Sequence, residues 1–503
     1  MKNKYRSISN ILNLMGYLLI LFTIILTIPL LYSYLQSTQK IFYSFFYPFL
    51  ISLSFGTILI KVFDKGKLSI AQGMIVCTLG WLFLSFIGAL PYVFGIKASF
   101  INSYFEAMSG FTTTGITMFT GLDKFPKAIL LWRSLTQWIG GLGIITFFLA
   151  ISSKIQGAHR LFGAESHKAD TDRPAPGLIN TVKILWLIYS FFTILIIFLL
   201  YLNGMNLFDS INHSFTALST GGFSTHDSSI SYFMINNFKN YRLLEYIIIL
   251  GMLLGGISFV THYFFLKGRL KKVIKNIELR YFIGIILLFF GVILFEKVLR
   301  HDIYDGIRIF SKEFWLVTED NIRNILFQVV SILTTTGFGT KDIGSQYFGA
   351  AAKQIFLLAM FIGGCVGSTG GGFKVMRVAI LNKVVKLKIF KFIAPKNSLN
   401  TLYYEGKKID REEINRINTI LFLWIGLIFL GGIVTALFSN QGALSSVSGM
   451  FSALGNIGPS YMSVKEMINL NPLIKLVYIF GMLAGRLEIL PVILLFKRKA
   501  WYF

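Results

Sequence analysis

Long apolar stretches separated by short polar segments dominate the hydropathy pattern of the chain. A helix that crosses a membrane needs about 20 mostly apolar residues. Ten such stretches occur, near residues 11–36, 41–60, 68–95, 129–153, 182–203, 243–266, 280–297, 352–373, 417–438 and 473–496. The pattern predicts an all-α polytopic membrane protein with ten membrane helices. An even number of spans places both termini on the same side of the bilayer.

Four shorter apolar stretches lie between these segments, near residues 99–111, 207–218, 322–333 and 443–454. They are too short to cross a bilayer and indicate re-entrant half-helices. Each is followed at once by a turn rich in small and hydroxyl residues that contains a glycine, namely Gly115, Gly222, Gly337 or Gly458. Internal repetition of this kind indicates that one supersecondary unit is used several times.

The predicted unit is a helix, a half-helix, a glycine turn and a second helix, arranged four times around a pseudo-fourfold pore. The first two helices fall outside the repetition. The expected boundaries are an N-terminal helix pair at 1–66 and pore repeats at 67–160, 176–270, 277–395 (with a broken second helix) and 412–503.

Composition and charge support the membrane class and fix the expected orientation. Hydrophobic residues make up 54% of the chain and charged residues 14%, which excludes a water-soluble, disordered or fibrous protein. The net charge of +25 is not spread evenly, since 31 of the 48 Lys and Arg residues fall on the side that also carries the termini. Because basic residues collect in cytoplasmic loops, both termini are expected in the cytoplasm. Nucleic acid is therefore not expected as a partner.

The four glycine turns carry the candidate chemistry. Irregular backbone at membrane depth is tolerated only where protein buries it or water adjoins it. In a ring of loops, carbonyl oxygens can replace the hydration shell of a monovalent cation, and glycine allows the positive φ that turns them inward. The alternative is that each turn is an ordinary one, or that each glycine packs helices. The candidate filter residues are Thr113, Thr114, Gly115, Thr220, Gly221, Gly222, Thr335, Thr336, Gly337, Asn456, Ile457 and Gly458.

A glycine-rich segment from Gly363 to Gly372 predicts a break in a membrane helix. It holds six glycines in ten residues, and each interior glycine disfavours helix by about 1 kcal/mol relative to alanine. Close packing of small residues is one interpretation. The other is an unwound loop beneath the filter that blocks the cavity, with the break near 367–372. The candidate gate residues there are Gly367, Ser368, Thr369, Gly370, Gly371 and Gly372.

Arg486 is a charged residue inside the last apolar stretch. A charge at this depth normally faces protein or water. It either forms a structural ion pair with another helix or acts as a positive barrier to cations below the filter. Glu488 is two positions away, so the two side chains point to different sides of a helix.

Several other polar residues have simpler interpretations. Glu106 is expected to be a buried, hydrogen-bonded support for the first glycine turn, and His213 and His262 are expected to be structural. Cys77 and Cys365 lie inside apolar stretches and are expected to be small buried residues without a disulfide or zinc site. The cytoplasmic run Lys383, Lys386, Lys388 and Lys391 fits either a lipid headgroup face or a docking surface.

Several motifs carry a family resemblance over almost the whole chain. The segments 219–225, 336–338 and 455–459 around the glycines, with 137–143 and 361–374, resemble those of the Trk/Ktr/HKT superfamily of potassium transporters. The extra helix pair before the first repeat is similar to that of the bacterial TrkH/TrkG branch.

The resemblance implies a channel-like potassium uptake subunit in the bacterial cytoplasmic (inner) membrane. Potassium would bind as substrate at the filter residues, and no covalent cofactor is implied. The resemblance further implies a homodimer in the lipid bilayer, regulated by a cytoplasmic nucleotide-binding protein of the TrkA type. It also assigns Arg486 and the glycine-rich segment to the gate.

The residues alone leave two other functions open. A proton- or sodium-coupled cation symporter would use broken helices at the midplane, although such a site usually has two corresponding irregularities rather than four. An intramembrane enzyme would need more than the Asp302–Asp305 pair, because no second acidic motif or catalytic group accompanies it. The chain is therefore not expected to be an enzyme.

Overall fold

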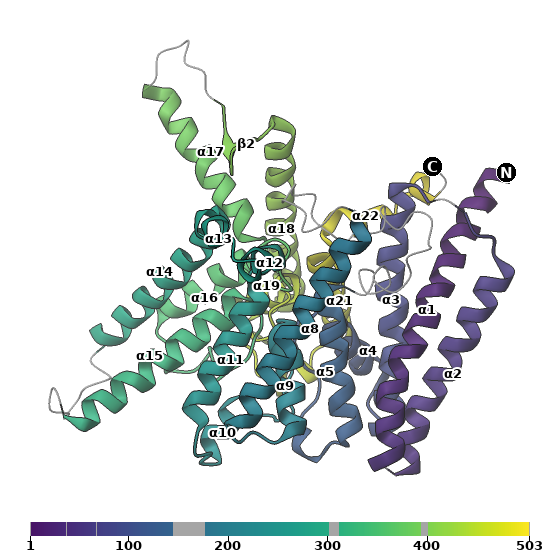
Figure 1. The fold of residues 1–503 in the computed structure, drawn as a ribbon, viewed down its shortest axis with the longest axis horizontal. Coiled ribbons are helices and arrows are strands. Elements are labelled where there is room, and N and C mark those ends of the chain that lie inside the picture. Colours follow the sequence, from purple (N-terminus) through teal and green to yellow (C-terminus); the bar gives the residue numbers. More distant parts are fainter. Residues whose placement is uncertain are drawn as a thin grey trace.

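The fold is almost entirely helical, as predicted. The computed structural model describes residues 2–36, 38–66, 68–143, 177–300, 311–393 and 401–501. Among these residues the only strands form a small antiparallel hairpin, in which β1 (Tyr403–Tyr404) pairs with β2 (Lys407–Lys408). Figure 1 shows the helices side by side, with both chain ends and the protruding α17–hairpin region at the same end of the molecule.

Among the described residues, six helices are long and apolar enough to cross a membrane, so the protein is a multi-pass membrane protein. They are α1 (Lys2–Gln36), α2 (Gln39–Val62), α3 (Ile70–Ile96), α8 (Leu178–Leu202), α14 (Ile277–Leu299) and α18 (Arg411–Phe438). Two bent pairs raise the number to as many as eight. They are α11 (Tyr241–Gly256) with α12 (Phe259–Leu266), bent by 105°, and α21 (Pro472–Leu487) with α22 (Ile489–Leu495), bent by 119°.

The predicted total of ten spans is not reached among the described residues and stays a prediction. The apolar stretches 129–153 and 352–373 contain helices too short to count, α5 (Lys127–Leu142) and α16 (Ala350–Ile362). α5 ends at Gly143, which has φ 89°, and α16 ends at Gly363, which has φ 73°. Each end therefore coincides with a glycine in a backbone conformation that does not continue a helix.

Three of the four short apolar stretches form short helices as expected: α4 (Phe100–Phe111), α9 (Leu207–Leu218) and α19 (Ala443–Gly455). The third stretch differs, because it is the second half of the 22-residue helix α15 (Lys312–Leu333). The hydroxyl of Ser311 accepts a hydrogen bond from the Phe314 N–H and starts this helix ten residues early. Its first half is polar, which is why hydropathy alone missed it.

The remaining elements are short connections, apart from the long α17. They are η1 (Leu122–Lys124), α10 (Ser231–Ile235), α13 (Leu270–Lys275), α17 (Val375–Ile393), α20 (Val464–Ile468) and η2 (Arg498–Trp501).

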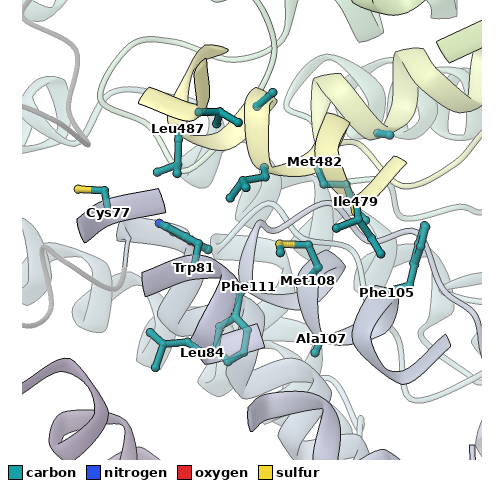
Figure 2. Packing of buried hydrophobic residues seen from close by; sticks show 14 of the residues in the cluster. Cys77, Trp81, Leu84, Phe105, Ala107, Met108, Phe111, Ile479, Met482 and Leu487 are labelled. Carbon is teal, nitrogen blue, oxygen red and sulfur yellow. The ribbon is translucent and has the colours of Figure 1, made fainter. Parts of the chain in front are cut away.

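The apolar core surrounds the short helices. Figure 2 shows one part of it, where Trp81 of α3, Phe111 of α4 and Met482 of α21 belong to one buried cluster. The indole N–H of Trp132 donates to Gly88 O over 2.9 Å, and its ring contacts Phe22 of α1. α1 is therefore packed against α5, the helix that follows the first glycine turn. Cys77 and Cys365 are both buried, as expected.

A pair of small residues lies in the last turn of four helices, or directly after it. The pairs are Gly140-Gly141 in α5, Gly255-Gly256 in α11, Gly363-Gly364 after α16 and Ala484-Gly485 in α21. A Cβ on Gly140 would lie 2.0 Å from Phe111 O, and one on Gly485 would lie 1.9 Å from Leu454 O. These glycines let their helices touch the ends of the short helices. The sequence predicted a break only in the third of the four helices.

Candidate ion-conducting site

The four glycine turns share one backbone conformation. In each, two residues separated by one position have positive φ. The first residues of the pairs have φ between 52° and 61° and are Thr113, Thr220, Thr335 and Asn456. The second residues have φ between 72° and 108° and are Gly115, Gly222, Gly337 and Gly458. Threonine rarely adopts such a conformation, so the surrounding structure must hold these turns in place.

The four turns close a ring. Each glycine faces the carbonyl oxygen of the residue that precedes the glycine of the next turn. A Cβ on Gly115 would lie 2.2 Å from Gly221 O, and one on Gly222 would lie 2.0 Å from Thr336 O. A Cβ on Gly337 would lie 1.9 Å from Ile457 O, and one on Gly458 would lie 3.0 Å from Thr114 O. The structure therefore brings all twelve candidate filter residues together in what we call the filter ring, residues 113–115, 220–222, 335–337 and 456–458.

A cavity of about 460 Å³ adjoins the filter ring. The four glycines line it, together with the segments that follow them in the chain. Charged residues on its wall include Asp227, Lys341 and Asp342. Asp227 accepts hydrogen bonds from the backbone N–H groups of Gly121 and Leu122, over 2.8 and 3.2 Å. This contact joins the segments that follow the first and second turns.

The opposite side of the filter ring contacts the predicted gate. The backbone is not helical from Gly363 to Lys374, which we call the intramembrane loop. The hydroxyl of Thr335 accepts from Gly371 N over 2.7 Å, and the hydroxyl of Thr220 lies 3.2 Å from that of Thr369. The predicted break near 367–372 is therefore present and longer than expected, and it lies directly against two of the four turns.

Arg486 connects the intramembrane loop to two other elements. Its guanidinium donates to Thr369 O over 2.7 Å and to the Thr113 hydroxyl over 3.2 Å. It also donates to the carbonyl oxygens of Gly140 and Gly141, each over 2.5 Å. Arg486 thus lies beside the first turn. It donates hydrogen bonds to backbone carbonyl oxygens of the loop and of the end of α5. The nearby Glu488 pairs with Arg377 of α17.

Buried polar residues nine positions before the first three of these glycines support their turns. The Glu106 carboxylate accepts from Met118 N over 2.6 Å, as expected of a support. His213 Nε2 lies 3.0 Å from the Ser224 hydroxyl, and Gln328 Nε2 lies 3.5 Å from Phe338 O. Glu106 and His213 stand out separately in the sequence, whereas Gln328 does not. Aligning the chain on its four glycines would have revealed it, because all three share one register.

Gln137 is a second supporting residue whose role the sequence pattern does not reveal. Its side chain extends from α5 and bridges two backbone groups of the second turn. Nε2 donates to Gly221 O over 2.7 Å, and Oε1 accepts from Phe223 N over 3.0 Å. Gln137 therefore fixes the backbone on both sides of Gly222.

The segment after the second turn contains a histidine between two carboxylates. His226 Nδ1 lies 2.5 Å from Asp123 and Nε2 lies 3.3 Å from Asp209, while the ring stacks on Tyr232 at 3.4 Å. Burial favours the neutral ring, but the hydrogen bonds to Asp209 and Asp123 outweigh it and raise the pKa of His226 above its usual value.

This pKa shift makes the stability of the protein pH-dependent. The ion pairs contribute fully below the unfolded pKa of about 6.5 and are lost as the pH rises through the higher folded value. We expect the unfolding temperature of the purified protein to fall between pH 6 and pH 9 more steeply than that of His226→Gln. Parallel curves for the two proteins would contradict the assigned pairing.

Comparison with known proteins identifies the family. The family model described as "TrkH: Cation transport protein" matches residues 41–501. This chain belongs to the TrkH family. It is 33% identical to the Trk system potassium uptake protein TrkH of Salmonella typhimurium over 508 residues, with 99% of each chain covered. It is 31% identical to the Trk system potassium uptake protein TrkG of Escherichia coli, with 97% of each covered.

A solved TrkH-family structure has the same fold. The crystal structure of the potassium transporter TrkH from Vibrio parahaemolyticus matches with a TM-score of 0.84 and 30% identity. The match covers 98% of this chain and 99% of the other. The resemblance to the TrkH/TrkG branch is thereby confirmed. Members of this family are transport proteins rather than enzymes, in agreement with the sequence analysis.

Proposed function

We propose that this TrkH-family chain is a potassium-translocating membrane subunit and that K⁺ passes through the filter ring as through a channel. The observation that carries the proposal is the closed ring of four turns with the same positive-φ pattern. The names of the relatives, potassium uptake proteins, agree with it. The ring is built from four unlike segments of one chain, in keeping with four pore repeats at the boundaries expected from the sequence.

The chemistry of the ring suits a dehydrated monovalent cation. Backbone carbonyl oxygens can replace its hydration shell without a fixed anion that would hold it too tightly. The helices α4, α9, α15 and α19 end at the turns, so the negative ends of their dipoles lie nearest the ring. The arrangement attracts a cation while still allowing its release.

Reversal potentials test the proposal. Purified protein in liposomes is expected to give a reversal potential close to the K⁺ equilibrium potential under opposed K⁺ and Na⁺ gradients. A reversal potential that follows an imposed proton gradient, or the Na⁺ gradient during K⁺ movement, would instead establish a coupled symporter. Absence of K⁺ flux from correctly folded protein would overturn the proposal.

We further propose that the intramembrane loop and Arg486 form the gate. The loop lies against the filter ring, and the guanidinium places a positive charge where a cation would leave it. Arg486→Ala is therefore expected to raise K⁺ flux about tenfold without changing selectivity, because the barrier is lost while the ring is untouched. Deleting Gly370 to Gly372 should act in the same direction, and the double variant should gain less than the sum of both effects.

Arg323→Ala is the matched control for Arg486→Ala. Arg323 is fully buried and pairs with Glu245 over 2.5 Å, but it lies in α15, away from the loop. An equal rise in flux in this variant would mean that losing any buried arginine loosens the pore. Unaltered flux in Arg486→Ala would favour a purely structural arginine.

The orientation is proposed from the distribution of basic residues. Both termini and the loops 153–183, 267–280 and 374–416 are placed in the cytoplasm of a bacterial inner membrane. Cysteines at Ser166 and Asn397, which lie outside the described residues, should resist an impermeant thiol reagent added to intact cells. A cysteine at the exposed Lys239 should react. The opposite labelling pattern would invert the topology.

The assembly follows from the same family relationship. We propose a homodimer in the lipid bilayer with a cytoplasmic nucleotide-binding regulator of the TrkA type. The relatives are named as parts of a Trk system, which supports a complex of more than one component.

A further inference from the structure

Glu278 lies at the cytoplasmic end of α14, beside both ends of the intramembrane loop. Its carboxylate is 7% exposed. Oε1 accepts a hydrogen bond from Val366 N over 2.7 Å and another from Met376 N over 3.1 Å. Val366 follows the glycine pair that ends α16, and Met376 is in the first turn of α17. One carboxylate oxygen therefore binds both Val366 and Met376, the two positions between which the loop would have to move.

The residues between these two points depend on this tie. Lys374 has φ 86°, a strained value for a residue with a side chain, and its ammonium donates to Gly370 O within the loop. This hydrogen bond folds the loop back on itself between the two points that Glu278 holds.

A chain of contacts leads from Glu278 to the cytoplasmic surface. The preceding residue, Ile277, donates its backbone N–H to the carboxylate of Glu405 over 3.1 Å. Glu405 is exposed at the turn of the β1–β2 hairpin. Lys383 of α17 holds the same hairpin by donating to Tyr403 O over 2.9 Å. The hairpin therefore contacts the starting end of α14 and the helix that follows the loop, α17, beside which it lies in Figure 1.

We propose that Glu278 is a positioning residue that latches the intramembrane loop in its closed position, and that the β1–β2 hairpin supports the latch from the cytoplasmic side. The inference rests on the proposed gate. Opening requires the two ends of the loop to separate, which breaks both hydrogen bonds to the same carboxylate oxygen. Displacing the hairpin removes the contact at Ile277 and so loosens the latch without touching the loop itself.

Basal K⁺ flux of the full-length protein in liposomes tests the latch. Glu278→Ala is expected to raise flux about tenfold, because it removes two hydrogen bonds that contribute about 0.5–1.5 kcal/mol each and 1.4 kcal/mol corresponds to a factor of ten. Glu278→Gln keeps an oxygen acceptor and should give a smaller rise. Glu405→Ala, on the exposed hairpin, should raise flux two- to threefold. The K⁺/Na⁺ permeability ratio should stay unchanged in all three variants.

Glu296→Ala is the matched control. Glu296 lies on the same helix, and its carboxylate also accepts two backbone hydrogen bonds, from Ala351 N over 2.9 Å and Ala352 N over 2.8 Å. These bonds hold the start of α16 at the far end from the loop. Equal flux in Glu278→Ala and Glu296→Ala would overturn the latch. So would an undiminished effect of Glu278→Ala after deletion of Gly370 to Gly372, since a latch acts only through the loop.

The comparison with Arg486→Ala separates the latch from the gate. If Arg486→Ala raises flux and both Glu405→Ala and Glu278→Gln leave it at the wild-type level, the latch is wrong and the gate stands. If Arg486→Ala and the loop deletion also leave flux unchanged, the proposed gate itself fails. Because Glu405 is on the surface, its variant decides the question even where Glu278→Ala does not fold.

Discussion

Gly222→Ser and Gly337→Ser are each expected to lower the K⁺/Na⁺ permeability ratio about tenfold or more. A tenfold change corresponds to about 1.4 kcal/mol in the free-energy difference between the two ions. A Cβ at Gly222 would lie 2.0 Å from Thr336 O, and one at Gly337 would lie 1.9 Å from Ile457 O. Neither oxygen can stay where it is. Both glycines also have positive φ, at 72° and 85°, which a serine rarely adopts. Bi-ionic reversal potentials measure the ratio directly.

The control for these variants is Gly426→Ser. Gly426 lies in α18, and a Cβ there would have no other atom within 4 Å. It should express and select like the wild type. A permeability ratio in Gly222→Ser and Gly337→Ser equal to that of the control, with normal expression, would count against the filter ring.

Arg133→Ala is expected to destabilise the protein by about 3–5 kcal/mol, the usual cost of leaving a buried charge without its partner. Arg133 is 1% exposed and Glu106 is fully buried. Their ion pair measures 2.8 Å, and the guanidinium also donates to Ser224 O over 2.9 Å and lies over the Phe223 ring at 4.2 Å. Its loss leaves the buried Glu106 carboxylate without the positive charge that compensates it, so Glu106 must either stay unpaired or take up a proton. The unfolding temperature in detergent is the measurement.

Arg242→Ala provides the matched comparison for Arg133→Ala. Arg242 pairs with Glu319 at 3.4 Å, but its side chain is 42% exposed. Exposed pairs contribute at most about 1 kcal/mol, so this variant should unfold close to the wild-type temperature. Removing both buried charges, in Arg133→Met with Glu106→Gln, should recover part of the loss. Equal unfolding temperatures for the two alanine variants would contradict the buried-pair interpretation.

The glycine turns were predictable because their signal is local. A short apolar stretch followed by threonines and a glycine occupies neighbouring positions in the chain, and the fourfold recurrence identifies it. The glycine-rich break after α16 was predictable for the same reason. The bends after α11 and α21 were not, because hydropathy reports how apolar a stretch is and not the direction in which it runs.

The supports of the filter ring were harder to predict because their partners are distant in sequence. Gln137 contacts Gly221, which is 84 residues away, and Arg486 contacts Gly140 from 346 residues away. Neither partner can be inferred from the pattern around the residue itself. The predicted alternatives for Arg486 were an ion pair or a barrier. Its observed acceptors include backbone carbonyls at the end of α5 and in the intramembrane loop, which no side-chain pattern reveals.

The filter ring is assembled from four unlike segments of a single polypeptide. In a pore built from four identical subunits, one codon change alters all four quadrants at once. Here a substitution changes one quadrant, and the contact of each glycine with the carbonyl of the next turn passes part of the disturbance to one neighbour. Under the proposed function, ion preference can therefore evolve in small steps, quadrant by quadrant, and Asn456 and Ile457 occupy positions where the first and third turns have threonine.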